Sequence, residues 1–189
     1  MKIIGVTDRK LCKNDFFSQI EYICANDSLY ALILREKDLT DKEYEEYAVK
    51  CNDICKKHNV LFFINTKINI AKKLNIKNIQ LSFNDFSENR DRLNGFENVG
   101  VSVHSLKEAQ FVEKNTVQPF NFSIFLIVGH IFLTDCKKGL APRGIKFLQE
   151  ICDNVNIPVF AIGGINKETV KLLDGINLSG TCMMSSLMK

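Results

Sequence analysis

Reactive side chains gather between Val128 and Leu140, in the segment Val-Gly-His-Ile-Phe-Leu-Thr-Asp-Cys-Lys-Lys-Gly-Leu. The apolar run before it, residues 122–128, predicts a fully buried strand, and the chain leaves that strand through a glycine. His130 follows at once, and an imidazole can move a proton near neutral pH. A polar turn with a helix-capping histidine would give the same local pattern, so the rest of the chain must decide between the two.

Other titratable residues are weaker candidates. His104 directly precedes a capping box, which makes a structural hydrogen bond sufficient to explain it, and His58 is expected to be solvated. No activating base for Cys136 is visible in the sequence. The seven cysteines form no Cys-x-x-Cys pair and are expected to be reduced; Cys51 and Cys55 share a helical face but lack the nearby histidine pair of a metal site.

Length and composition predict a single domain spanning residues 1–189, because 189 residues with 46% apolar side chains can build one substantial core. The net charge of +3 is spread without a basic block, which argues against nucleic acid as a partner. No run approaches the roughly 18 apolar residues of a membrane span, and the first residues lack the features of a signal peptide. The expected location is the cytoplasm.

Short apolar runs alternate with amphipathic segments along the whole chain, a pattern typical of repeated βα units with a parallel sheet. The expected strands are residues 2–6, 29–34, 60–64, 78–81, 99–103, 122–128, 158–162 and 176–184. Asn14, the capping boxes at Thr40 and Ser105, and Asn166 are expected to begin helices. Eight strands favour an α/β fold of the closed (β/α)8 TIM-barrel type, in which the eighth helix is missing or truncated because few residues follow the last strand.

Polar side chains stand at the carboxyl ends of these strands, where such barrels place their active sites. They include Arg35, Lys37, Asn65, Ser102, His104, His130 and Ser185, and the Gly163-Gly164 pair follows another strand at the same rim. This gathering favours a functional role for His130. The Gly163-Gly164 pair would let backbone amides approach an anion, and Arg35 with Lys37 would contact a second anionic group across the mouth. A glycine turn needed only for the chain path, and charged residues that only meet solvent, are the alternatives.

These residues, in this order, resemble the thiamin phosphate synthase superfamily, and within it the TenI-type thiazole tautomerases. The matching segments are residues 6–9, 34–37, 64–65, 102–105, 161–165 and 184–185. The most specific segment is Gly129–Leu140, which is similar to the tautomerase form of this loop. The resemblance covers essentially the whole chain.

Two departures weaken the synthase form of the family. The synthase binds magnesium and the pyrophosphate of an aminopyrimidine through an Asn-Asp pair and a Gly-Gln-x-Asp motif. Here the pair is Asn65-Thr66, and the later motif reads Ser-Phe-Asn-Asp from Ser82 to Asp85. A single Asp85 is a poor magnesium site. The Arg35-Glu36-Lys37 segment nevertheless keeps the synthase form.

The resemblance implies an isomerase that aromatises a phosphorylated carboxythiazole tautomer, with His130 as the catalytic residue and no cofactor. It also implies two sets of binding residues. The substrate would contact Arg35, Lys37, Asn65, Ser102, Thr134, Cys136 and Lys137, and its phosphate would contact Gly163, Gly164, Met184 and Ser185. The expected partners are a small thiazole phosphate and a second copy of the chain in a homodimer.

Two alternatives stay open. One is a thiamin phosphate synthase, a transferase that joins an aminopyrimidine pyrophosphate to thiazole phosphate with magnesium at Asp85. The other is a non-catalytic regulatory binder of thiazole phosphate that kept the barrel. Magnesium dependence separates the isomerase from the synthase, and loss of activity in His130→Ala separates the isomerase from the binder.

Overall fold

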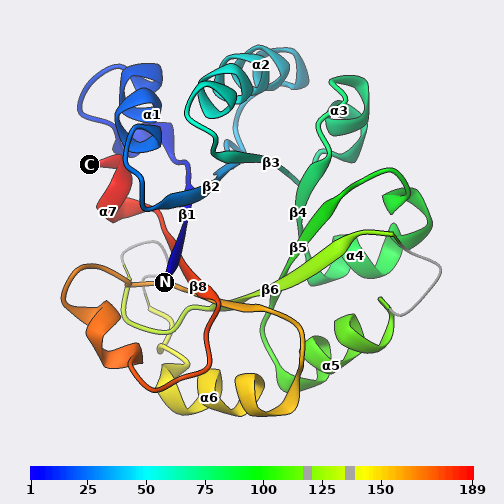
Figure 1. Ribbon diagram of the computed structural model, residues 1–189, viewed down its shortest axis with the longest axis vertical. Helices are drawn as coiled ribbons and strands as arrows, with labels where there is room; N and C mark the ends of the chain where they lie inside the picture. Colours follow the sequence, from blue (N-terminus) through cyan, green and yellow to red (C-terminus); the bar gives the residue numbers. More distant parts are fainter. Residues whose placement is uncertain (117–120, 135–138) are drawn as a thin grey trace.

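The computed structural model describes residues 1–116, 121–134 and 139–189. Eight strands of these residues are all parallel and close into a barrel in which each strand pairs with its sequence neighbours and the last pairs with the first (Figure 1). The strands are β1 (Lys2–Val6), β2 (Leu29–Leu34), β3 (Leu61–Asn65), β4 (Asn78–Ser82), β5 (Asn98–Val103), β6 (Ser123–Gly129), β7 (Val159–Ile162) and β8 (Gly180–Met183). The predicted (β/α)8 barrel is confirmed.

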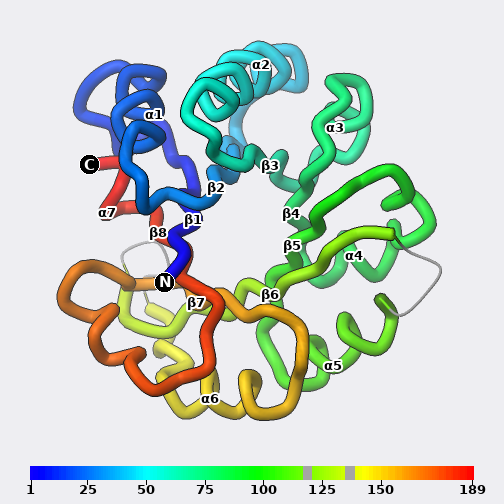
Figure 2. The backbone as a smooth tube through the Cα atoms, viewed as in Figure 1, coloured from blue at the N-terminus to red at the C-terminus, as the bar shows by residue number. Residues whose placement is uncertain are grey.

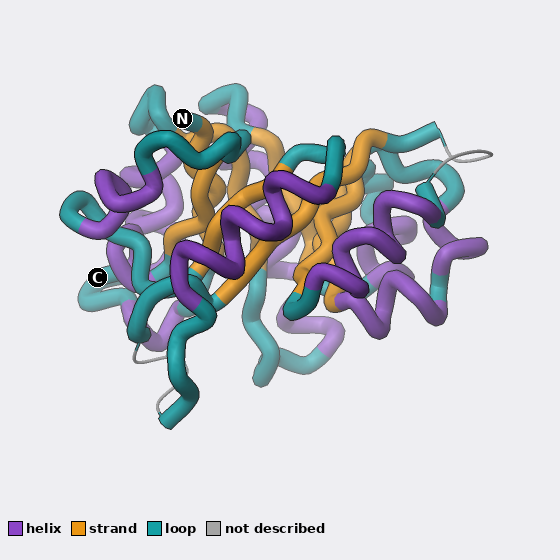
Figure 3. Tube along the Cα trace, turned by 90° about the horizontal axis from the view of Figure 1, so that it is seen from below, coloured by secondary structure: helices purple, strands orange, loops and turns teal. Residues whose placement is uncertain are grey.

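Helices surround the barrel, and the strands run inside them when the molecule is seen from the side (Figure 3). The α-helices are α1 (Phe16–Cys24), α2 (Asp41–Lys57), α3 (Ile68–Lys73), α4 (Phe83–Glu88), α5 (Leu106–Lys114), α6 (Gly144–Asn154) and α7 (Ser185–Met188). Three 3-10 helices of the described residues are η1 (Arg9–Leu11), η2 (Arg90–Leu93) and η4 (Thr169–Leu173). None of the helices in the described ranges combines the length and apolar character needed to span a membrane.

The two faces of each strand pack into different cores because successive side chains alternate across a strand. Side chains such as Ile4, Ala31 and Phe160 fill the barrel interior. Their neighbours, such as Leu32 and Ala161, pack outward against the helices in a second, larger core. At the carboxyl end of each strand, the next inward-facing side chain therefore points into the mouth of the barrel, where the site lies.

Side-chain caps begin several helices, as the sequence predicts. At Thr40 both halves of the capping box are present. At α1 the predicted cap is off by one residue, because Asp15 rather than Asn14 accepts the hydrogen bond from the Ser18 amide. The segment from Ser82 to Asp85, expected to be a polar loop, is a second full capping box that begins α4.

The last two βα units are short. Asn166 accepts hydrogen bonds from the amides of Glu168 and Thr169 as expected, but the segment it caps leads only to the five-residue 3-10 helix η4. The final strand is also shorter than predicted, and the eighth helix is reduced to the single turn α7.

This turn covers the outer side of the barrel at β8. It lies beside α1 (Figure 2), where the Gln19 side-chain amide donates to the Leu187 carbonyl at 2.5 Å. Met188 is fully buried, as is Thr181 on β8. The truncation of the eighth helix therefore does not expose the barrel wall.

Candidate active site

A cavity of about 390 Å³ opens at the carboxyl ends of the strands, a volume typical of small-molecule sites. Every described residue to which the sequence analysis gave a catalytic, substrate-binding or phosphate-binding role lines it: Arg35, Lys37, Asn65, Ser102, His130, Thr134, Gly163, Gly164, Met184 and Ser185. Cys136 and Lys137 lie outside the described residues. The barrel brings these residues together, and their individual roles stay predictions.

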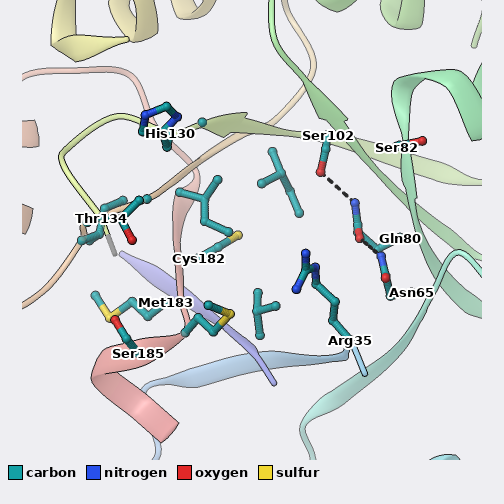
Figure 4. A pocket seen from close by; sticks show the side chains of 18 of the residues that line it. Arg35, Asn65, Gln80, Ser82, Ser102, His130, Thr134, Cys182, Met183 and Ser185 are labelled. Carbon is teal, nitrogen blue, oxygen red and sulfur yellow. Dashed lines mark hydrogen bonds between the residues drawn. The ribbon is translucent and has the colours of Figure 1, made fainter. Parts of the chain in front are cut away.

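The cavity has a polar wall and an apolar wall (Figure 4). Polar side chains from β3, β4 and β5, among them Asn65 and Ser102, line one side with Arg35 beside them. Ile127, Ile162 and Cys182 from β6, β7 and β8 line the other. Burial raises the pKa of the Cys182 thiol, so this sulfur stays neutral and behaves as apolar surface.

A backbone hydrogen bond holds Arg35 in place, and its guanidinium forms no ion pair with another described residue. Its amide donates to the Thr7 hydroxyl oxygen at 2.9 Å, and that hydroxyl donates to the buried Glu36 carboxylate at 2.7 Å. Glu36 also accepts from the backbone amide and the guanidinium of Arg9. Because Arg9 satisfies Glu36 outside the barrel, neither Arg35 nor Lys37 forms an ion pair within the described parts of the chain. Both cations are available to an anionic ligand.

The Tyr44 hydroxyl links the ends of β2 and β3 by hydrogen bonds. It donates to the carbonyl of Leu34, the residue before Arg35, and accepts from the Asn65 amide at 3.2 Å. Burial raises the pKa of Tyr44, which keeps the hydroxyl protonated and able to donate. The two site residues are thus held at a fixed separation by one side chain of α2.

A row of hydrogen bonds runs along the polar wall. The Asn65 side-chain amide donates to the Gln80 carbonyl oxygen. The Gln80 side-chain amide donates in turn to the Ser102 hydroxyl oxygen at 2.9 Å and to the Leu81 carbonyl at 2.7 Å. Asn65 and Gln80 are both buried, and the dashed lines in Figure 4 show the row from β3 to β5.

His130 is 6% exposed and packs against the turn after β7. Its Nε2 lies 3.4 Å from the Leu140 carbonyl, and its buried Nδ1 has no hydrogen-bond partner among the described residues. The Gly129–His130 peptide bond is cis. The ring caps none of the helices in the described ranges. Buried ring nitrogens normally have partners, so this unpaired nitrogen is unusual. The His130 side chain lines the cavity, although its Nδ1 is closed to solvent in this structure.

The other two histidines have structural hydrogen bonds. At the cavity rim, the His104 amide donates to the Glu108 carboxylate at 2.7 Å, as its position before a cap predicted. His58 was expected to be solvated, which is wrong, because its Nε2 lies 2.7 Å from the Glu21 carboxylate between α2 and α1 and the side chain is 20% exposed. Lys57 and then His58 lower the pKa of Glu21.

Glycines and short helical turns form the opposite end of the cavity. Gly163 and Gly164 have φ angles of +102° and +66°, which L-residues rarely adopt. A Cβ on Gly164 would lie 2.4 Å from the Leu133 carbonyl oxygen, so packing against the segment after β6 already requires glycine here. Ser185 and Ser186 are the first residues of α7, whose amides have no partner within the helix. An anion at this end would meet backbone N–H groups.

The residues present do not fit a magnesium site. Asp85 accepts from the Ser82 hydroxyl at 2.6 Å as the cap of α4 and is not among the residues that line the cavity. No carboxylate stands among the described lining residues, and the described ranges hold no group of three metal-ligating side chains. Thr66 occupies the other position. Magnesium favours carboxylates together with ligand phosphates, and this lining offers none.

Comparisons with known proteins agree with this architecture. The family model described as thiamine monophosphate synthase matches residues 3–187. The chain belongs to the thiamine monophosphate synthase family. A thiamine-phosphate synthase from Fusobacterium nucleatum is 31% identical over 99% of this chain and 89% of the relative. One from Clostridium tetani is 32% identical over 97% of this chain and 86% of the relative.

Solved structures show the same fold. The thiamine phosphate pyrophosphorylase from Pyrococcus furiosus superposes with a TM-score of 0.80 at 24% identity, covering 99% of this chain and 87% of that one. The expected family is confirmed. The names of these relatives fit the synthase alternative better than the isomerase, for which they give no support.

Sequence reasoning missed several residues of the site. Asn78, Gln80 and Ser82 occupy every second position of β4, a spacing that puts them on one face of the strand and could have placed Gln80 in the cavity. The role of the Tyr44 hydroxyl had no comparable signal. Its partners come from two other strands, and only the folded chain brings them together.

Proposed function

We propose that this chain is a thiazole tautomerase of thiamin biosynthesis. Its substrate would be a phosphorylated, carboxylated dihydrothiazole with an exocyclic double bond. A proton leaves the ring carbon that bears the carboxylate, and a proton is added to the exocyclic carbon, so the product is the aromatic thiazole isomer. One imidazole can serve as base and then as acid, and aromaticity drives the shift.

The observation that carries the proposal is a histidine, His130, lining a cavity whose described lining has no carboxylate. The reaction needs one group that exchanges a proton near neutral pH, and His130 is of that kind. It does not need the metal and pyrophosphate site for which this lining lacks ligands.

The charge distribution also suits a substrate with two anionic groups. Arg35 and Ser185 stand on opposite sides of the cavity in Figure 4, and Lys37, Gly163 and Gly164 also line it. The guanidinium would contact the carboxylate, and the backbone amides near Gly163 and Ser185 would contact the phosphate. The ring between them would lie within reach of the imidazole, which follows β6 on the same side of the cavity as the apolar wall.

The second candidate is the thiamin phosphate synthase, which the names of the relatives favour. It requires the pyrophosphate of an aminopyrimidine to be held and neutralised. Arg35 and Lys37 could supply part of that charge, but Thr66 and the capped Asp85 supply none of the carboxylates for magnesium.

Two assays on one purified protein test the proposal. The isomerase assay follows aromatisation of the thiazole tautomer, and the synthase assay follows formation of thiamin phosphate, each with magnesium and with EDTA. We expect isomerisation that is indifferent to EDTA and no synthase product. Thiamin phosphate formed only with magnesium, with no isomerisation, would establish the synthase instead.

The variant His130→Asn tests the catalytic group, with His58→Asn as the matched control outside the cavity. We expect His130→Asn to lower turnover by roughly 10²–10⁴-fold, the usual contribution of a positioned acid or base, and to keep the affinity for the product. The control should keep its turnover. Thiazole phosphate binding without isomerase or synthase activity in the parent protein would identify the regulatory binder.

A further inference from the structure

One backbone atom, the Leu81 carbonyl oxygen, determines which residue donates and which accepts in each hydrogen bond of the polar wall. The Gln80 side chain contacts the Leu81 carbonyl, an oxygen that can only accept. The nitrogen of the Gln80 amide must therefore face Leu81, and its oxygen must face the opposite way, toward Asn65. No rotation that exchanges the amide nitrogen and oxygen satisfies Leu81.

The orientation of Gln80 fixes the orientation of both its neighbours, Asn65 and Ser102. Asn65 faces a carbonyl oxygen and must present its nitrogen there, which leaves its own oxygen directed elsewhere. Ser102 receives a hydrogen bond at its oxygen from Gln80, so its hydroxyl proton is free to point away from Gln80. Ser102 lines the cavity and is partly exposed to it.

We propose that Gln80 is a positioning residue that sets the polarity of this wall, so that Ser102 donates a hydrogen bond to the anionic group of the substrate that Arg35 neutralises. The hydrogen bond from Ser102 to the substrate rests on the proposed function, in which that anionic group is a carboxylate. The orientation of Asn65 and Ser102 does not rest on it. Gln80 itself has both ends of its amide occupied and acts only through its neighbours.

The orientation can be tested without a ligand. Asn65→Asp replaces the donor that faces the Gln80 oxygen by a second acceptor, so at neutral pH the variant should unfold at lower urea concentration than the parent. Asn166→Asp is the matched control, because the Asn166 oxygen already accepts from two backbone amides. Its midpoint should not fall. Equal midpoints for the parent and both variants would overturn the assigned polarity.

The role in binding is tested with two probes, the carboxylated thiazole phosphate and thiazole phosphate without the carboxylate. Gln80→Met keeps the length of the side chain and removes its hydrogen bonds. It should weaken binding of the carboxylated probe by roughly 10- to 100-fold, the effect of losing one hydrogen bond to a charged group, and leave the other probe unchanged.

Ser102→Ala should give the same selective loss, and the double variant should bind no more weakly than either single variant, because the two residues act as one unit. Losses that are equal for both probes, or that multiply in the double variant, would overturn the role of Gln80. If the parent binds both probes equally, the carboxylate part of the proposed function fails. The unfolding measurements still decide the polarity.

Gln80→Glu tests whether the donors and acceptors of Gln80 matter beyond the space that its side chain fills. At neutral pH its carboxylate can only accept, so it draws the Ser102 proton away from the cavity and faces the Leu81 carbonyl without a donor. Burial raises the pKa of a glutamate, and acidification gives it a proton with which to bond Leu81. The affinity deficit of Gln80→Glu relative to the parent should therefore narrow as the pH falls. A deficit independent of pH would show a purely structural role.

Discussion

Gly163 lets the turn after β7 touch the catalytic candidate directly, and Gly163→Ala tests this contact. A Cβ at this position would lie 2.5 Å from the Cβ of His130 and 2.7 Å from its Cα. Both are nearer than such atoms approach in folded proteins, and neither belongs to the flexible end of a side chain. The alanine methyl can be accommodated only if the histidine and the turn move apart.

The loss of folding stability expected in Gly163→Ala has two parts, and a control variant separates them. Gly163 has a φ of +102°, and a non-glycine residue at positive φ costs about 1–3 kcal/mol. The collision adds about another 1–3 kcal/mol, as overpacked interiors do. Gly95 has a φ of +90°, and a methyl group there would meet nothing within 4 Å beyond its neighbours in the chain, so Gly95→Ala should show the first part alone.

Urea unfolding and steady-state turnover of the proposed isomerisation measure the two effects. We expect Gly163→Ala to be less stable than Gly95→Ala and to lose turnover, because the imidazole is displaced, whereas Gly95→Ala should keep the parent turnover. If both variants lose the same stability and both remain active, the contact between Gly163 and His130 does not position the ring, and the reasoning is wrong.

Three further perturbations test the surroundings of the site. Tyr44→Phe should lower the unfolding free energy by about 1–3 kcal/mol, because a buried amide at the end of β3 loses its acceptor. Tyr47→Phe is the control and should keep the parent stability, because the Tyr47 hydroxyl bonds no described residue. Equal urea midpoints for the two variants would contradict the role of the Tyr44 hydroxyl. Thr66 has a φ of +59°, so Thr66→Gly should raise the unfolding free energy by roughly 1 kcal/mol in the same assay, and a decrease would refute the strain. The Arg9 guanidinium lowers the pKa of Asp38 in the folded protein. This pair stabilises the fold above the unfolded pKa of about 4 and loses that effect as the pH falls below it. The stability difference between the parent and Asp38→Asn should therefore shrink in acid, and a difference that grows would contradict the assignment.

The sequence determined the barrel and the position of its site. Alternating apolar runs and amphipathic segments predict βα units, because this pattern depends only on residues close together in the sequence. The parallel strands of a barrel then bring all their carboxyl ends to one rim. Arg35, Asn65, Ser102 and His130 could be placed at that rim without the structure because each stands at or just after the end of an apolar run. The capping box at Thr40 was equally local and was predicted correctly.

Only the tertiary structure decided what each side chain does at that rim. Asp85 stands near a strand end like the others, yet it turns back to cap α4. The Ser82-x-x-Asp85 spacing of a capping box was a local signal for this role, and the sequence analysis overlooked it. The polarity of Gln80 depends on contacts with β3, β5 and the Leu81 carbonyl, and the packing of His130 depends on the turn at Gly163. The contacts of Gln80 with Asn65 and Ser102, and of His130 with Gly163, join residues on different strands or strand ends. They are therefore set by how the strands pair around the barrel and not by the order of residues along any one strand.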